Sequence, residues 1–219
     1  MATRRLLAEL LAAYQKRTGR SVAIESVGGV DAAKRVQAGE PFDVVVLASD
    51  AIDKLLAAGH LLAGSKVDLV HSGVAIAVRA GAARPDIGSE EALKRAVQNA
   101  KSIGYSTGPS GVALTQLFER WGIADAVLQR IVQARPGVPV GALVARGEVA
   151  LGFQQLSELM HLEGIDVIGP LPDAVQITTT FSGGVCAASQ QADAVRALLD
   201  FMASPEAGAT KRRYGMEPA

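Results

Sequence analysis

Short apolar runs that end in small polar turns, each followed at once by an amphipathic helix, recur along this chain. Residues 43–48 (DVVVLA) and 149–153 (VALGF) are continuous apolar runs, and residues 103–105 (IGY) form a shorter one. Such runs are typical of strands that helices cover on both faces. Their alternation with helices on short loops predicts an α/β fold built from mostly parallel sheets flanked by helices.

Two longer extended runs, residues 69–79 and 175–189, differ from these short buried strands and bracket the middle of the chain. We interpret them as crossover segments between two lobes. A chain of 219 residues is long enough for two small α/β lobes. We therefore predict lobe I over residues 1–74 plus 181–219 and lobe II over residues 75–180.

The amino terminus has basic residues before an apolar patch, as a signal peptide does. Leu6, Leu10 and Tyr14 follow helical spacing, however, and Glu9 interrupts the apolar stretch. We expect an amphipathic surface helix that ends at Gly19. This interpretation predicts a cytoplasmic location for the chain as written, or a periplasmic one if the natural start lies upstream. No run of roughly 18 apolar residues is present, so no membrane span is expected.

The charge balance and the reactive side chains exclude several classes of site. Lys plus Arg and Asp plus Glu both number 22, which argues against a nucleic-acid partner. The lone Cys186 cannot form an intrachain disulfide and is expected in the core. His60, His71 and His161 lack metal-ligand spacing, and no phosphate-loop fingerprint is present, so we predict no metal and no cofactor.

Residues 102–114 (SIGYSTGPSGVAL) form the stretch best suited to a ligand. An apolar run leads into a small polar turn, and a helical pattern follows directly. Such a turn directs free backbone N–H groups and the positive end of a helix dipole at one point, which suits an anion. We predict ligand contacts from Thr107, Ser110 and Gly111.

Other predicted strands end in similar loops. Residues 21–27 (SVAIESV) are rich in β-forming residues and predict a strand before a glycine turn and a helix. Ligands of open α/β sheets bind at the carboxyl ends of strands, although each loop is also explained as an ordinary turn with an ordinary helix cap. The further candidate ligand-binding residues are Gly28, Gly29, Ser49, Gly137, Val138 and Gln155.

Several motifs, in this order, resemble the substrate-binding proteins of molybdate uptake systems, a branch of the type 2 periplasmic binding proteins. They are AGEPFDVVVLAS (38–49), DKLLAAGHL (53–61), GPSG before VALTQLFERWGI, LVARGEVALGF (143–153) and ASPEAGATKRRYGMEP (203–218). The resemblance covers nearly the whole chain. It implies two α/β lobes joined by two crossovers, a small anion in the cleft between them, and the permease of an ABC transporter as a partner.

The resemblance also assigns site residues. The family's second ligand-binding serine falls on Gly29, the amide of its proline-glycine turn on Ser110, the next amide near Gly137, and its tyrosine on Gln155. These replacements favour an organic carboxylate or similar anion over molybdate. The family's opening strand is not found before the first helix. Its loss would uncover strand edges beside residues 22–27 and 44–47, which a homo-oligomer would cover.

The leading interpretation is thus a solute-binding protein for a small anion, with no catalytic residue assigned. The alternative is an isomerase of a small carboxylate, because aconitate isomerase resembles the same family. Moving a double bond in a tricarboxylate needs a proton acceptor and donor, for which Glu25, Asp50, His71 and Glu158 are the candidates. A cytoplasmic anion sensor and an inactive relative are further alternatives.

Overall fold

The computed structural model describes residues 2–135 and 137–219. The chain forms two compact units, one of Met1–Ser72 with Thr179–Ala219 and the other of Gly73–Thr178. The chain therefore passes between the units twice, within strand β2 (Val67–Arg79) and at the start of strand β7 (Thr178–Val185). In the described part of the chain, no helix is long and apolar enough to cross a membrane.

The first unit contains a sheet made of strands distant in sequence. Strand β1 (Val44–Ala48) runs antiparallel to β7, from Val44 opposite Val185 to Ala48 opposite Phe181. The first part of β2 pairs with the short strand β8 (Glu217–Pro218). The prediction of a strand at residues 43–48 is confirmed, but its expected parallel direction is wrong, because its partner is the returning strand β7.

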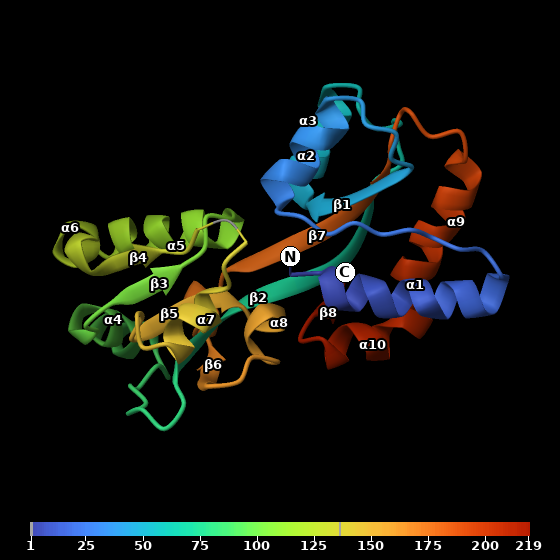
Figure 1. Ribbon diagram of the computed structural model, residues 1–219. Coiled ribbons are helices and arrows are strands. Elements are labelled where there is room, and N and C mark those ends of the chain that lie inside the picture. Colours follow the sequence, from blue (N-terminus) through green and yellow to red (C-terminus); the bar gives the residue numbers. More distant parts are fainter. Residues whose placement is uncertain (1, 136) are drawn as a thin grey trace. The chain divides into compact units, whose positions relative to one another are not determined.

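Helices pack around this sheet in two groups. Helices α2 (Gly29–Gln37) and α3 (Ser49–Ala57) lie alongside β1 (Figure 1). The other group shares an apolar cluster in which Tyr14 and Phe201 lie with ring centroids 5.3 Å apart. Its members are α1 (Arg4–Thr18), α9 (Ala192–Ala203) and η3 (Pro205–Ala207), and α10 (Gly208–Arg213) packs against α1 and η3. The prediction that the first helix ends at Gly19 is confirmed, and Gly19 adopts φ +72°.

Residues 21–27, expected to be a strand, form no regular secondary structure. These residues are rich in β-forming side chains. Among the described strands, however, β1 pairs only with β7, and residues 21–27 pair with none. A strand is stable only when its backbone groups pair with a neighbour. The apolar side chains of Ile24 and Val27 are consequently exposed by 42% and 37%.

The second unit holds the parallel strands. Strand β3 (Ile103–Tyr105) lies between β4 (Ile131–Gln133) and β5 (Leu151–Gln155) and is parallel to both. The second part of β2 pairs antiparallel with β5 on one side and with β6 (Ile165–Pro170) on the other. The helices of this unit are α4 (Glu90–Asn99), α5 (Pro109–Arg120), α6 (Ala124–Val127), η1 (Leu128–Arg130), α7 (Val140–Ala145), α8 (Leu156–Leu159) and η2 (Asp173–Val175).

Different helices cover the two faces of this sheet. On one face, Phe118 of α5 lies 6.4 Å from the ring of Phe153 of β5, within the largest apolar cluster. On the other face, a Cβ atom on Gly152 would lie 2.5 Å from a methyl group of Val144 in α7. The absence of a side chain at Gly152 therefore lets α7 lie close against the strand.

Candidate functional site

Three parallel strands of the second unit end at the same edge of its sheet, which we call the carboxyl edge. In the pairing register, Tyr105 lies opposite Gln133, and Gly104 lies opposite both Val132 and Gly152. A helix follows each strand at this edge: α5 follows β3 and α7 follows β4, each across a loop, and α8 follows β5 directly. The predicted residues that the carboxyl edge brings together are Thr107, Ser110, Gly111, Gly137, Val138 and Gln155.

The start of α5 carries backbone groups that suit an anion. Its N-cap, Gly108, is extended and supplies no side-chain cap, and Pro109 has no N–H group. The Gly111 amide donates to the Gly108 carbonyl oxygen at 2.9 Å. Within the described residues, neither the amide nor the hydroxyl of Ser110 has a hydrogen-bond partner, and Ser110 is 8% exposed. Ser110 therefore offers two donors at the positive end of a helix dipole.

The rest of this turn divides between exposed and internally bonded groups. Thr107 is exposed. The Ser106 hydroxyl accepts a hydrogen bond from the Gly108 amide at 3.4 Å, so it helps to form the turn itself. Burial raises the pKa of the Tyr105 phenol, which keeps this side chain neutral beside the turn.

The loop between β4 and α7 is held at its start, where the Ala134 amide donates to the Tyr105 carbonyl oxygen at 2.9 Å. Gly137 adopts φ +81°, a conformation that favours glycine. The Val138 amide donates to the Arg135 carbonyl oxygen at 3.0 Å and is therefore used within the turn. Pro136, which belongs to the same predicted loop, lies outside the described residues.

The end of β5 presents two carboxamides to opposite faces of the sheet. Gln154 contacts α7, because its Oε1 accepts a hydrogen bond from the Gly141 amide at 3.3 Å. Phe153 lies on the face of α5. Successive residues of a strand alternate between faces, so Gln155 shares the α5 face with Phe153. Gln155 is 4% exposed and lies at the edge where α5 begins.

Two polar residues beside the candidate site were missed by sequence reasoning. Gln154 is the penultimate residue of β5 and is 4% exposed. The sequence signal that could have identified it is a polar carboxamide directly after the apolar run at residues 149–153. Ser157 is 8% exposed, and its buried hydroxyl has no hydrogen-bond partner within the described residues. No sequence pattern marked Ser157.

The three candidates of the first unit gather at the end of β1. Gly28 is the N-cap of α2, and a Cβ atom on Gly29 would lie 3.7 Å from the Leu47 side chain of β1. Ser49 is the first residue of α3, directly after β1. Neither helix has an N-cap side chain that accepts a hydrogen bond from its first amides. The predicted binding by these three residues stays a prediction, as does the predicted cleft between lobes.

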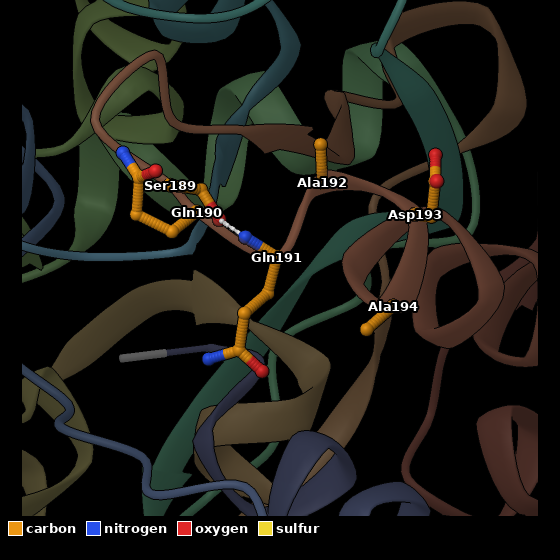
Figure 2. Close-up of a pocket in the computed structure, with 6 residues that line it drawn as sticks. All are labelled: Ser189, Gln190, Gln191, Ala192, Asp193 and Ala194. Carbon is orange, nitrogen blue, oxygen red and sulfur yellow. Dashed lines mark hydrogen bonds between the residues drawn. The ribbon is translucent and has the colours of Figure 1, made fainter.

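A shallow depression in the first unit is lined by residues 189–194 (Figure 2). The Ser189 hydroxyl donates to the Asp43 carboxylate at 2.7 Å and accepts from the amide of Gln191, the residue before α9, at 3.1 Å. This depression contains none of the predicted site residues. Its hydroxyl group already has two partners, so we do not assign a ligand to it.

Metal and thiol chemistry find no support in the described residues. No group of three or more His, Cys, Asp or Glu residues in that part of the chain is placed to hold a metal ion. Cys186 is 2% exposed, as expected for a core residue. Its burial, and secondarily the charge of Asp43, raise the pKa of the thiol to about 11. The thiol is therefore protonated at neutral pH.

Comparison with known proteins identifies the family. The family model described as "Bacterial extracellular solute-binding protein" matches residues 1–217. The chain belongs to this family. It is 42% identical over 216 residues to an aconitate isomerase from a Pseudomonas species, a match that covers 96% of this chain and 82% of the relative. It is 24% identical over 218 residues to the molybdate-binding protein ModA of Azotobacter vinelandii, covering 94% of this chain and 83% of that protein.

Solved structures agree on the fold. The substrate-binding domain of a putative molybdenum ABC transporter from Clostridium difficile has a TM-score of 0.78 at 17% identity, covering 100% of this chain and 95% of that one. The periplasmic molybdate-binding protein of Azotobacter vinelandii also has a TM-score of 0.78, at 22% identity, covering 98% and 94%. The expected type 2 periplasmic-binding-protein fold and the resemblance to molybdate-binding proteins are confirmed.

Proposed function

We propose that this member of the solute-binding family binds a small organic anion with several carboxylate groups. One carboxylate is held at the carboxyl edge of the second unit by the amide and hydroxyl of Ser110, with the Gln155 carboxamide on the same face of the sheet. The observation that carries the proposal is the unused pair of donors on Ser110. A hydrogen bond to a charged ligand contributes about 1.5–3 kcal/mol, so a few such bonds support micromolar binding.

The relatives favour a carboxylate over molybdate. Identity to the aconitate isomerase is 42%, against 24% to the molybdate-binding protein. Gly29 and Gln155 stand where the resemblance to the molybdate binders calls for hydroxyl groups. A carboxylate is planar and accepts hydrogen bonds through two oxygens, which suits an amide and a hydroxyl on one residue.

Isomerisation of aconitate is the second candidate function, favoured by the 42% identity. The double bond moves when a base removes a proton from one carbon and an acid returns a proton to another, while hydrogen-bond donors stabilise the enolate between these steps. Of the four candidate acid–base residues, Glu158 lies in the second unit, on α8 just after the carboxyl edge. Its carboxylate accepts a hydrogen bond from Gln154 at 2.7 Å.

For a protein that binds the anion without isomerising it, we propose delivery of the anion to the permease of an ABC transporter. It rests on the family and on relatives such as the C. difficile transporter domain. Assembly into a homo-oligomer stays a prediction.

Calorimetric titration with cis-aconitate, trans-aconitate, citrate, molybdate and sulfate tests the proposal. We expect binding and a raised melting temperature with the polycarboxylates, because a ligand that binds only the folded state stabilises it. Tighter binding of molybdate than of any polycarboxylate would refute the choice of ligand. Incubation with cis-aconitate, followed by NMR, separates the two functions: conversion to trans-aconitate establishes an isomerase, and binding without conversion establishes a solute-binding protein.

A further inference from the structure

Gln154 is a buried carboxamide on an otherwise apolar face of β5. The nearby side chains on this face include Val140, Val144 and Leu159, all fully buried. Gln154 itself is 4% exposed. Burying a carboxamide costs free energy unless hydrogen bonds replace those made to water. The hydrogen bonds of Gln154 therefore indicate why it is accommodated there.

Gln154 connects the two helices that follow the carboxyl edge. Its Oε1 accepts from the Gly141 amide of α7 at 3.3 Å, and its Nε2 donates to the Glu158 carboxylate of α8 at 2.7 Å. Gly141 is the second residue of α7, and the N-cap of this helix is Pro139, which has no polar side chain. The Gln154 side chain thus satisfies an amide that the local sequence leaves without a cap.

This cap lies at one end of the loop that contains Gly137 and Val138. The other end is held by the bond from the Ala134 amide to the Tyr105 carbonyl oxygen, at 2.9 Å. The loop is therefore anchored to β3 at its start and to β5 at its end. Gln154 is also the chain neighbour of Gln155, which shares the face of Ser110 and α5.

We propose that Gln154 is a positioning residue for the anion site, acting without touching the ligand. It fixes the loop before α7 through Gly141 and fixes the start of α8 through Glu158. The inference rests on the proposed function, because the loop and Gln155 matter to a ligand only if an anion binds at the carboxyl edge. The network itself joins residues of this chain and is tested separately.

The test compares four variants of the full chain with the wild type, using trans-aconitate as the probe. Gln154→Leu removes both hydrogen bonds and keeps similar volume. Gln154→Glu keeps an acceptor for Gly141 but sets a second carboxylate against Glu158. The double variant Gln154→Glu/Glu158→Gln restores the hydrogen bond between positions 154 and 158 with donor and acceptor exchanged. Val144→Ala is the matched control, because it removes buried apolar volume from α7 without touching a polar group.

Amide hydrogen exchange of Gly141, measured without ligand, tests whether the Gln154 side chain holds the start of α7. We expect the Gly141 amide to exchange at least tenfold faster in Gln154→Leu than in Val144→Ala, when the two are compared under conditions of equal thermal stability. Calorimetric titration measures the effect on affinity. We expect Gln154→Leu and Gln154→Glu each to weaken trans-aconitate binding about tenfold, which corresponds to the loss of one hydrogen bond. The double variant returns to within about threefold of the wild type, a recovery that a purely structural loss does not explain.

Wild-type affinity in Gln154→Leu, or no recovery in the double variant, would overturn the positioning role. Unchanged exchange at Gly141 would overturn the anchor itself. A wild-type protein that binds none of the polycarboxylates refutes the proposed function and, with it, the ligand part of this inference. The exchange measurement distinguishes that failure from a failure of the network, because it uses no ligand.

Discussion

The carbonyl oxygen of Ser106 lies 1.9 Å from the point where a Cβ atom on Gly111 would be placed. No side chain fits there, because atoms that are not bonded do not approach so closely. The backbone of the turn thus passes directly over the first turn of α5. Gly111 is therefore required by the packing of the turn, whatever ligand binds beside it.

Replacement of Gly111 by alanine should push the turn away from α5. We expect a loss of about 1–3 kcal/mol of unfolding free energy, the usual cost of overpacking, and at least tenfold weaker anion binding. Denaturant unfolding and calorimetric titration measure the two effects. Gly108→Ala is the control, since its Cβ atom would lie 3.6 Å from the nearest heavy atom, the Ser106 hydroxyl oxygen. Equal behaviour of the two variants would contradict the steric explanation.

Loss of the Ser110 hydroxyl should weaken binding while leaving the fold intact. Ser110→Ala keeps the amide at the start of α5 and removes one donor, so we expect about 1–2 kcal/mol weaker binding of trans-aconitate. Thr115→Ala on the same helix is the matched control, because the Thr115 hydroxyl bonds to the Val112 carbonyl oxygen at 2.7 Å. Isothermal titration compares them. If Ser110→Ala binds like Thr115→Ala, the anion does not contact this hydroxyl.

Local signals in the sequence predicted the elements whose stability is local. Gly19 ends the first helix as expected. Residues 21–27 failed as a strand because β propensity describes a side chain on a paired strand, and these residues have no paired neighbour. The antiparallel direction of β1 likewise depends on β7, far along the chain.

The candidate site also has one part that the sequence predicts and another that it does not. The turn at Ser110 could be predicted, because a strand, a small polar turn and a helix start are adjacent in sequence. The cap that Gln154 gives to Gly141 depends on the distance between two separate segments, β5 and α7. The resemblance to a family located the loops but not this bond, since it assigns a site position to Gln155 and none to Gln154.

Arg35 should hold the irregular segment at residues 19–28 in place. Its guanidinium donates to Glu40 at 2.8 Å and to Glu25 at 2.7 Å, and lies 4.7 Å from the centroid of the Phe42 ring. Lysine keeps the charge but loses the planar fork and the stacking. We therefore expect faster thermolysin cleavage near the exposed Ile24 in Arg35→Lys at pH 7.

The control for this change is Arg17→Lys, whose ion pair with Glu206 is exposed on both sides. Its cleavage rate should match that of the wild type. The hydrogen bond from Arg35 lowers the pKa of Glu40, so this carboxylate stabilises the fold above its unfolded pKa near 4.5 and ceases to do so as the pH falls through the lowered value. Equal protection of residues 19–28 in all three proteins would show that Arg35 does not hold the segment.

Lys211 is an uncompensated charge in the core of the first unit, and its replacement should stabilise the protein. The side chain is 0% exposed, and its ammonium group has no hydrogen-bond partner within the described residues. Burial lowers the pKa of Lys211, which means that folding disfavours the charged form. Methionine matches the length of the aliphatic stem and carries no charge. We expect Lys211→Met to gain about 1–3 kcal/mol of unfolding free energy at pH 7.

The pH dependence distinguishes charge burial from a general gain in packing. Because the folded pKa lies below the unfolded value of 10.5, wild-type stability should rise as the pH increases between these two values. The advantage of Lys211→Met should therefore be full below the folded pKa and should shrink as the pH approaches 10.5. Melting temperatures of wild type, Lys211→Met and the exposed control Lys101→Met across this window measure it. A constant advantage at every pH, or destabilisation by Lys211→Met at pH 7, would show that the ammonium group is not the source of the cost.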